Sequence, residues 1–333
     1  MTTIASDDTQ VVAPRFKLSR PALVLLILSA LAVVSVVCFM TIGAKGSWSF
    51  VIPFRGRKLL GLILVAYSVA VSTVMFQTAT NNRILTPSIM GFDQLYVLLQ
   101  TSLVFFFGIG SLVSLDPTVH FTLEVVVMVG FASLLFSWLF VWQERSLHLL
   151  VLVGIVFGIM FRSLILFMQR IMDPNAFNVL QDTFFASFSR IDTQHMLFAY
   201  VITGIVSVFI VRMLPVFDVL NLGRANAINL GVNYRRSITS MLMMISVLVA
   251  ISAALVGPVT FFGLLVASLA HSLVGTSRHK YVLPAAALLA IICLVGGQTI
   301  LERVFEFDTA LSIIIEFLGG IVFIMLVLRR MAR

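Results

Sequence analysis

The stretch Asp218–Arg236 reads DVLNLGRANAINLGVNYRR and separates two long apolar runs. It contains two Leu-Gly pairs, Leu222-Gly223 and Leu230-Gly231, with Ala227 between them. Glycine readily adopts the left-handed conformation that ends one helix and lets the next begin at an angle. The spacing therefore predicts two short helices over approximately residues 216–232, with an ordinary polar loop as the alternative. A rigid helical pair transmits a displacement that a flexible loop would absorb, so we interpret this segment as a handle for a separate protein.

The chain around this segment has the composition of an integral membrane protein. Of its 333 residues, 60% are hydrophobic and only 11% are charged, and its mean hydropathy is +1.10. Soluble proteins contain roughly 25% charged residues. A membrane-spanning helix needs about 20 mostly apolar residues, because its backbone must satisfy its own hydrogen bonds in lipid. The apolar runs have this length and lack the short alternating pattern of membrane barrels, which predicts an all-α membrane protein.

The uncharged runs predict about ten transmembrane helices. We expect residues 1–21 to form a cytoplasmic N-terminal tail and residues 22–333 to form one transmembrane domain. The run at residues 237–277 is too long for one crossing, and Gly257-Pro258 within it predicts a break, because this pair ends a helix. The expected spans are approximately 22–42, 59–80, 90–110, 120–142, 147–169, 194–213, 237–256, 259–276, 281–301 and 309–328.

Positive charges indicate the orientation of these spans, because lysine and arginine are enriched in cytoplasmic loops. With a cytoplasmic N-terminus, 14 lysine and arginine residues fall on the inner side and 7 on the outer side, while Arg162 falls within a span. Both termini and Asp218–Arg236 are then cytoplasmic. The net charge of +8 is thus interpreted as orientation bias rather than as a nucleic-acid site.

Few polar residues within the spans suggest chemistry. Cys38 and Cys293 are interpreted as small buried hydrophobes rather than as a disulfide or metal ligands. His271 is expected to be a polar residue at the end of a helix, although ionisable groups in spans are often functional. Glu316 is either a coupling carboxylate or a neutral, paired side chain. The sequence contains no Ser-His-Asp set, H-E-x-x-H helix or Cys/His cluster, which argues against a membrane-embedded enzyme.

One basic cluster contradicts the charge bias. Phe54–Lys58, FRGRK, places three positive charges just outside the second span, on the side predicted to be outer. A harmless basic loop is one interpretation. The other is a docking site for an acidic partner that arrives from outside.

Three segments taken together resemble the permease subunits of ATP-binding-cassette (ABC) importers for iron-siderophores and vitamin B12, the FecCD type. The resemblance runs from about Gly43 to the C-terminus. One segment begins at the basic cluster and continues through Gln77 to the turn Asn82–Gly91. Another is the double Leu-Gly segment. The most specific is GPVTFFG, Gly257–Gly263.

The chain also departs from the family pattern at several positions. Lys58 and Asn82 stand where the family has Arg and Pro, and Ala267 stands where many members have Pro. The loop that follows Arg303 lacks the usual Pro-x-Gly, so its alignment is looser.

The resemblance implies a type II ABC importer permease fold, in which Asp218–Arg236 forms coupling helices that sit in a cleft of the ATPase. The residues implied in coupling are Leu222, Gly223, Ala227, Leu230 and Gly231. Those implied in docking of a solute-binding protein are Arg55, Arg57, Lys58 and Arg303, with Arg170 and Arg190 as secondary candidates. Those implied in the translocation path and its structural motif are Gln77, Asn82, Pro87, Gly91, Gly257, Pro258 and Gly263.

The sequence contains no G-x-x-x-x-G-K-[ST] phosphate loop, so ATP and Mg are expected on partner subunits and no cofactor on this chain. The resemblance implies two cytoplasmic ATPase subunits, a periplasmic siderophore-binding protein and a second permease, here expected to be a distinct chain. It places the protein in the lipid of a bacterial inner membrane. The expected substrate is a ferric siderophore of the catecholate type, with vitamin B12 or haem as alternatives. An ion-coupled secondary transporter would instead require paired acidic groups near the middle of the membrane.

Overall fold

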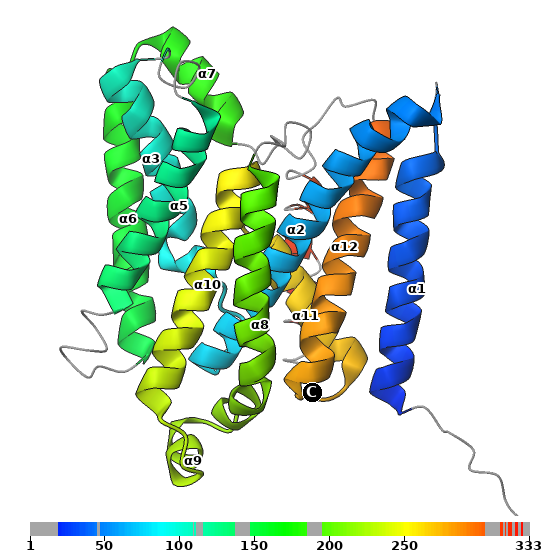
Figure 1. The fold of residues 1–333 in the computed structure, drawn as a ribbon. Coiled ribbons are helices and arrows are strands. Elements are labelled where there is room, and N and C mark those ends of the chain that lie inside the picture. Colours follow the sequence, from blue (N-terminus) through cyan, green and yellow to red (C-terminus); the bar gives the residue numbers. More distant parts are fainter. Residues whose placement is uncertain are drawn as a thin grey trace, which may run out of the picture.

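The computed structural model describes residues 19–44, 47–108, 110, 116–136, 147–184 and 195–303, and the separate positions 314–315, 317, 319–321, 324–325 and 328. Its regular elements within these residues are helices arranged as one bundle (Figure 1). The elements are α1 (Arg20–Thr41), α2 (Trp48–Thr80), the short 3-10 helix η1 (Pro87–Met90), α3 (Phe92–Phe107), α5 (Pro117–Phe136), α6 (Leu147–Ile171), α7 (Pro174–Phe184), α8 (Met196–Leu220), α9 (Arg224–Asn229), α10 (Tyr234–Val256), α11 (Phe262–Val274) and α12 (His279–Arg303).

Two helices form the centre of the bundle. In both α2 and α10, 72% of the most apolar window is buried, against 17% in α1 and α6. Helix α2 crosses the middle of the bundle obliquely and packs against α10 and α12, while α1 packs on the outside of α12 (Figure 1). The exposed apolar faces of the outer helices suit contact with lipid or with another membrane subunit.

Nine of the ten expected spans correspond to helices among the described residues. Seven of these helices are long and apolar enough to cross a membrane, and α3 and α11 are shorter apolar helices. The expected span 309–328 contains only scattered described positions, which are helical. The expected N-terminal tail lies outside the described residues up to residue 18.

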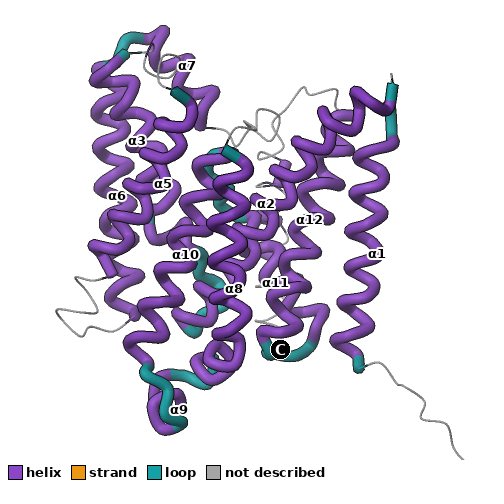
Figure 2. The backbone as a smooth tube through the Cα atoms, viewed as in Figure 1, coloured by secondary structure: helices purple, strands orange, loops and turns teal. Residues whose placement is uncertain are grey.

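The expected break at Gly257-Pro258 is confirmed. Helix α10 ends at Val256, Gly257 has φ +90°, and α11 begins only at Phe262. Because α11 has 13 residues, it rises about 20 Å, less than the hydrocarbon thickness of about 30 Å. Non-helical backbone at membrane depth is tolerated where protein covers it, and here it lies against α2 and the η1 turn (Figure 2).

Helix α2 corrects the expected position of the basic cluster. Residues 54–58 do not form a loop before the second span but lie within α2, which begins at Trp48 and has 33 residues. Its length of about 50 Å exceeds the hydrocarbon thickness, so the first turns project beyond it. Arg and Lys are good helix formers, and Pro53 near the start does not prevent the helix.

Helix α7 was not predicted from the sequence. This helix follows α6 directly, and Asp173 caps it: Oδ1 accepts a hydrogen bond from Asn175 N at 2.8 Å. Pro174 occupies the first helical position, where its missing N–H costs nothing. The Asp-Pro pair is thus a helix start, and the helix lies at the end of the bundle opposite α9 (Figure 1).

Candidate functional site

The segment between α8 and α10 contains one short helix where two were expected. Helix α8 continues without a break to Leu220, because Phe217 and Leu220 extend its buried face. Gly223, with φ +92°, then turns the chain into α9, and Gly231, with φ +80°, turns it into α10. The first expected coupling helix is therefore the end of α8, and the angle between the two helices lies at Gly223.

Backbone hydrogen bonds hold this coupling segment, defined as residues 221–233, in one shape. Val232 N donates to Ala227 O at 3.0 Å, and Gly231 N donates to Ile228 O at 2.9 Å. This pair of bonds is a helix-ending motif that requires a left-handed residue, which explains the second Leu-Gly pair. Asn233 Oδ1 then accepts from Arg236 N at 3.1 Å and caps α10.

The coupling segment exposes an apolar surface at its tip. Ala227 is fully buried, whereas Leu222, Ile228 and Leu230 are 56%, 50% and 62% exposed. The segment projects from one end of the bundle (Figure 1). Three large apolar side chains on a rigid projection are a surface suited to a protein partner.

The four docking candidates gather at the opposite end of the bundle, and the structure divides them into two pairs. The guanidinium of Arg55 donates to the carbonyl oxygens of Phe39 at 2.8 Å, Ile42 at 2.9 Å and Gly43 at 3.0 Å. It therefore caps the end of α1, whose last carbonyls have no partner within the helix. Lys58 Nζ lies 2.5 Å from Glu302 Oε1 of α12.

The other pair is exposed. Arg57 and Arg303 both present their side chains to the surface, and the guanidinium of Arg303 lies against Gly43. Secondary candidate Arg170 is exposed at the end of α6. Arg190 lies outside the described residues.

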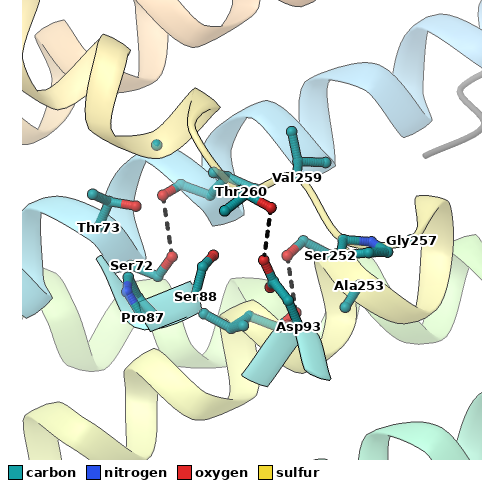
Figure 3. Close-up of a pocket in the computed structure, with 14 residues that line it drawn as sticks. Ser72, Thr73, Pro87, Ser88, Asp93, Ser252, Ala253, Gly257, Val259 and Thr260 are labelled. Carbon is teal, nitrogen blue, oxygen red and sulfur yellow. Dashed lines mark hydrogen bonds between the residues drawn. The ribbon is translucent and has the colours of Figure 1, made fainter. Parts of the chain in front are cut away.

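A polar pocket occupies the break between α10 and α11 (Figure 3). It contains four of the residues expected in the structural motif, Pro87, Gly257, Pro258 and Gly263. The side chains of Ser72 and Thr73 from α2, Ser88 from η1, Asp93 from α3, Ser252 from α10 and Thr260 also line it. Thr260 Oγ1 donates to Asp93 Oδ2 at 3.1 Å and ties the break to α3.

Two glycines of the motif permit close helix packing. A Cβ on Gly263 would lie 2.2 Å from Thr73 Oγ1, so α11 can approach α2 only with glycine at this position. A Cβ on Gly91 would lie 2.9 Å from the Cα of Gly158 in α6, and Gly91 also has φ +85°. Gly263 therefore serves packing beside the pocket, and Gly91 serves packing against α6.

The structure places Gln77 and Asn82 apart from this pocket, in the turn that ends α2. Gln77 is 3% exposed, and its Nε2 donates to Arg83 O at 2.8 Å. Asn82 Oδ1 accepts from Ile84 N at 3.0 Å. Both residues shape the turn between α2 and η1.

Sequence reasoning missed several polar residues in the interior. Asp93 is 8% exposed, and Glu124 is 1% exposed and accepts a hydrogen bond from Gln100 Nε2. Both lie within expected spans, at 90–110 and 120–142, but neither was singled out from the sequence. Their carboxyl groups are the signal that could have found them, since ionisable groups in membrane helices are costly and retained for a purpose.

Three further ionisable residues were singled out in the sequence. His271 lies in the last turn of α11, as expected, and its Nδ1 is buried without a hydrogen-bond partner. Arg162 is exposed in the middle of α6. Glu316 lies outside the described residues. Both cysteines are free and half-buried, and no group of metal-binding side chains occurs within the described ranges.

Comparison with known proteins agrees with this arrangement. The FecCD transport family model matches residues 18–329. The petrobactin import system permease protein YclO of Bacillus subtilis is 44% identical over 284 residues, 85% of this chain and 90% of its own. FatC, a petrobactin import system permease protein of Bacillus anthracis, is 36% identical, covering 85% of this chain and 80% of its own.

More distant matches include another named permease and a solved structure. The vitamin B12 import system permease protein BtuC of Vibrio cholerae is 26% identical and covers 95% of both chains. A solved chain of a metal-chelate type ABC transporter in an inward-facing conformation superposes with a TM-score of 0.80 at 23% identity, covering 93% of this chain and 99% of that one. The chain therefore belongs to the FecCD transport family and is a multi-pass membrane permease subunit of an ABC importer.

Proposed function

We propose that this chain forms part of the membrane path by which an ATP-driven importer carries a ferric siderophore into the cytoplasm. The observation that carries the substrate class is the 44% identity with a petrobactin permease over 85% of this chain. Ferric petrobactin is therefore the first substrate to test. The catecholate type is a prediction from the sequence resemblance, and the match to a vitamin B12 permease keeps vitamin B12 as the second candidate.

The coupling segment supports a separate motor subunit. Its exposed tip, Leu222, Ile228 and Leu230, rests on the buried Ala227 and is fixed by two left-handed glycines. We infer that two ATPase subunits carry ATP and Mg and that one of them grips this tip. The orientation proposed from the basic residues then places α9 and both termini in the cytoplasm.

The opposite end supports a periplasmic partner. Exposed Arg57 and Arg303 can pair with carboxylates of a siderophore-binding protein, while Arg55 and Lys58 hold the surface in place through their contacts within the chain. Exposed ion pairs contribute only ~0.2–1 kcal/mol each and weaken with salt, which suits a partner that docks and leaves. The second permease is proposed to be a related but distinct chain.

The test is purification of the complex through a tag on this chain, with mass spectrometry of the associated subunits. We expect a phosphate-loop ATPase and a second permease. The complex in liposomes, supplied with ATP on the coupling-segment side, should take up iron from binding protein loaded with ferric petrobactin. Uptake of vitamin B12 instead of iron would replace the substrate, and gradient-driven uptake without any ATPase would overturn the proposal.

A further inference from the structure

Three polar residues form a chain across α8, α12 and α2 close to the coupling segment. Asp218 lies five residues before Gly223, and its Oδ1 accepts from His279 N at 2.8 Å. The Nδ1 atom of His279 lies 2.7 Å from the same Oδ1, and its Nε2 lies 2.7 Å from Thr78 Oγ1. His279 and Thr78 are 2% and 5% exposed, so the bond between them is shielded from water. The side chain of Asp218 is 37% exposed and forms the solvent-facing end of the chain.

The chemistry of the groups sets the direction of these hydrogen bonds. A carboxylate only accepts, so the Nδ1–H of His279 donates to Asp218. In neutral imidazole Nε2 is then the acceptor, and the Thr78 hydroxyl donates to it. The ring of Phe217 packs edge-on against the imidazole at 5.8 Å between centroids and holds it in the plane that both bonds need.

This chain is the last of three polar links between α8 and α2. Tyr200 OH donates to Leu60 O at 2.7 Å, and Tyr67 OH and Ser207 Oγ lie 2.7 Å apart. Each of these pairs is separated by 140 residues in sequence, and so are Thr78 and Asp218. The two helices therefore run parallel in fixed register, and the links fall about two and about three turns apart on one face of each.

The position of the last link gives it a mechanical consequence. The first two links lie far along α8 from the coupling segment, whereas Asp218 is in the final turn of α8. Thr78 is about one and a half turns along α2 from Ser72 and Thr73, which line the pocket at the helix break. The backbone carries movement of the coupling segment into α8 and α10. Helix α2 packs against α10, and the Asp218–His279–Thr78 chain adds a polar connection from the end of α8 to α12 and α2.

Building on the proposed function, we propose that the Asp218–His279–Thr78 chain transmits displacement of the coupling segment to α2 and α12. The three are positioning residues, since they act through one another and do not line the pocket at the helix break. Without the chain, the end of α8 can move with a smaller displacement of α2 and α12. ATP hydrolysis then continues with less transport.

The test compares two threonines of the same helix. Both Thr78 and Thr80 are buried, and the Oγ1 atom of each lies near the carbonyl oxygen four residues earlier in α2, at 3.0 Å and 2.8 Å. A hydroxyl has one proton, so Thr78 donates it to His279 Nε2, whereas Thr80 donates it to the carbonyl. Only Thr78 also bonds His279. Thr78→Val is therefore the test variant, Thr80→Val its matched control, and Thr78→Ser the variant that keeps the hydroxyl.

The measurement is iron taken up per ATP hydrolysed by the purified complex in liposomes, with binding protein loaded with ferric petrobactin. We expect Thr78→Val to lower this ratio about fivefold to tenfold, the effect of one or two lost hydrogen bonds, and Thr80→Val and Thr78→Ser to leave it unchanged. Asp218→Ala should act like Thr78→Val, and Asp218→Asn, which keeps the acceptor oxygen, should restore the ratio. The double variant Thr78→Val/Asp218→Ala should be no worse than Asp218→Ala alone, since both break one chain.

Equal ratios for Thr78→Val and Thr80→Val in assembled complexes would overturn the inference, as would multiplied losses in the double variant. If the Thr78→Val complex fails to assemble, the comparison of Asp218→Ala with Asp218→Asn tests the inference instead. Equal ratios of iron uptake to ATP hydrolysis for these two variants would overturn it. A wild-type complex that hydrolyses no ATP contradicts the proposed function itself. A coupled wild type with unaffected variants contradicts only this transmission chain.

Discussion

Lys58 Nζ lies 2.5 Å from Glu302 Oε1 and joins the first turns of α2 to the last turn of α12. Gln298 Nε2 donates to the same oxygen at 2.9 Å. The two charged side chains are only 15% and 11% exposed, so neither is readily available to an outside partner. A residue expected to dock a binding protein therefore has a structural contact of its own.

We predict that Lys58→Met destabilises the protein by about 1–3 kcal/mol, because it leaves the poorly solvated carboxylate of Glu302 without its cation. The double variant Lys58→Met/Glu302→Gln should regain most of this loss. Thermal unfolding in detergent measures the stability of the wild type, the two single variants and the double variant, which together form a double-mutant cycle. Additive effects would show that the pair contributes nothing to stability.

Substitutions of two arginines at the same end of the bundle should distinguish a residue that docks the binding protein from one that stabilises the fold. Arg57→Glu should weaken binding of the solute-binding protein without lowering the unfolding temperature, because its side chain is exposed. Arg55→Ala should lower the unfolding temperature instead, because four carbonyl oxygens at the end of α1 lose their donor. The affinity of the Arg57→Glu variant for the binding protein is measured at low and at high salt. An affinity equal to that of the wild type at both salt concentrations would exclude docking at Arg57.

Gly263 should tolerate no side chain while Thr73 is present. Its added Cβ would meet Thr73 Oγ1 at 2.2 Å, and overpacking typically costs 1–3 kcal/mol. Gly263→Ala should thus lower the unfolding temperature and transport, and Thr73→Ala should partly restore both. Gly204→Ala in α8 is the control, since nothing lies within 4 Å of its added Cβ. Equal effects of the two alanine variants would contradict the close-packing explanation.

Replacement of Gly223 or Gly231 by valine should abolish uptake and the stimulation of ATPase activity. The φ angles of +92° and +80° disfavour a β-branched residue, so the tip formed by Leu222, Ile228 and Leu230 changes shape. Expression should persist, because an added Cβ meets no atom within 4 Å at either glycine.

Gly108→Val is the matched control for these coupling variants. Gly108 also has a positive φ, +76°, and open space around its Cβ, but it ends α3. It should therefore show any general cost of strain without loss of coupling. Normal uptake in both coupling variants would remove the role of the segment.

Local sequence signals predicted the features that depend on neighbouring residues alone. Long uncharged runs gave the approximate position of nine helices, because lipid leaves the backbone no alternative partner. Gly257-Pro258 predicted the helix break for a similarly local reason, since proline lacks a backbone N–H and glycine accepts a positive φ. The two Leu-Gly pairs located both turns of the coupling segment.

The tertiary structure alone decided which of these residues act together. Asp218 and Thr78 are 140 positions apart in the sequence. The distance between them depends on how α8 and α2 pack, so no local sequence pattern predicts it. Likewise, Arg55, Lys58 and Arg303 carry the same charge, but their neighbours in the fold give them different roles. Arg55 caps a helix, Lys58 forms an ion pair, and Arg303 is exposed. Charge is a property of a residue, whereas its availability is set by the side chains that the fold brings against it.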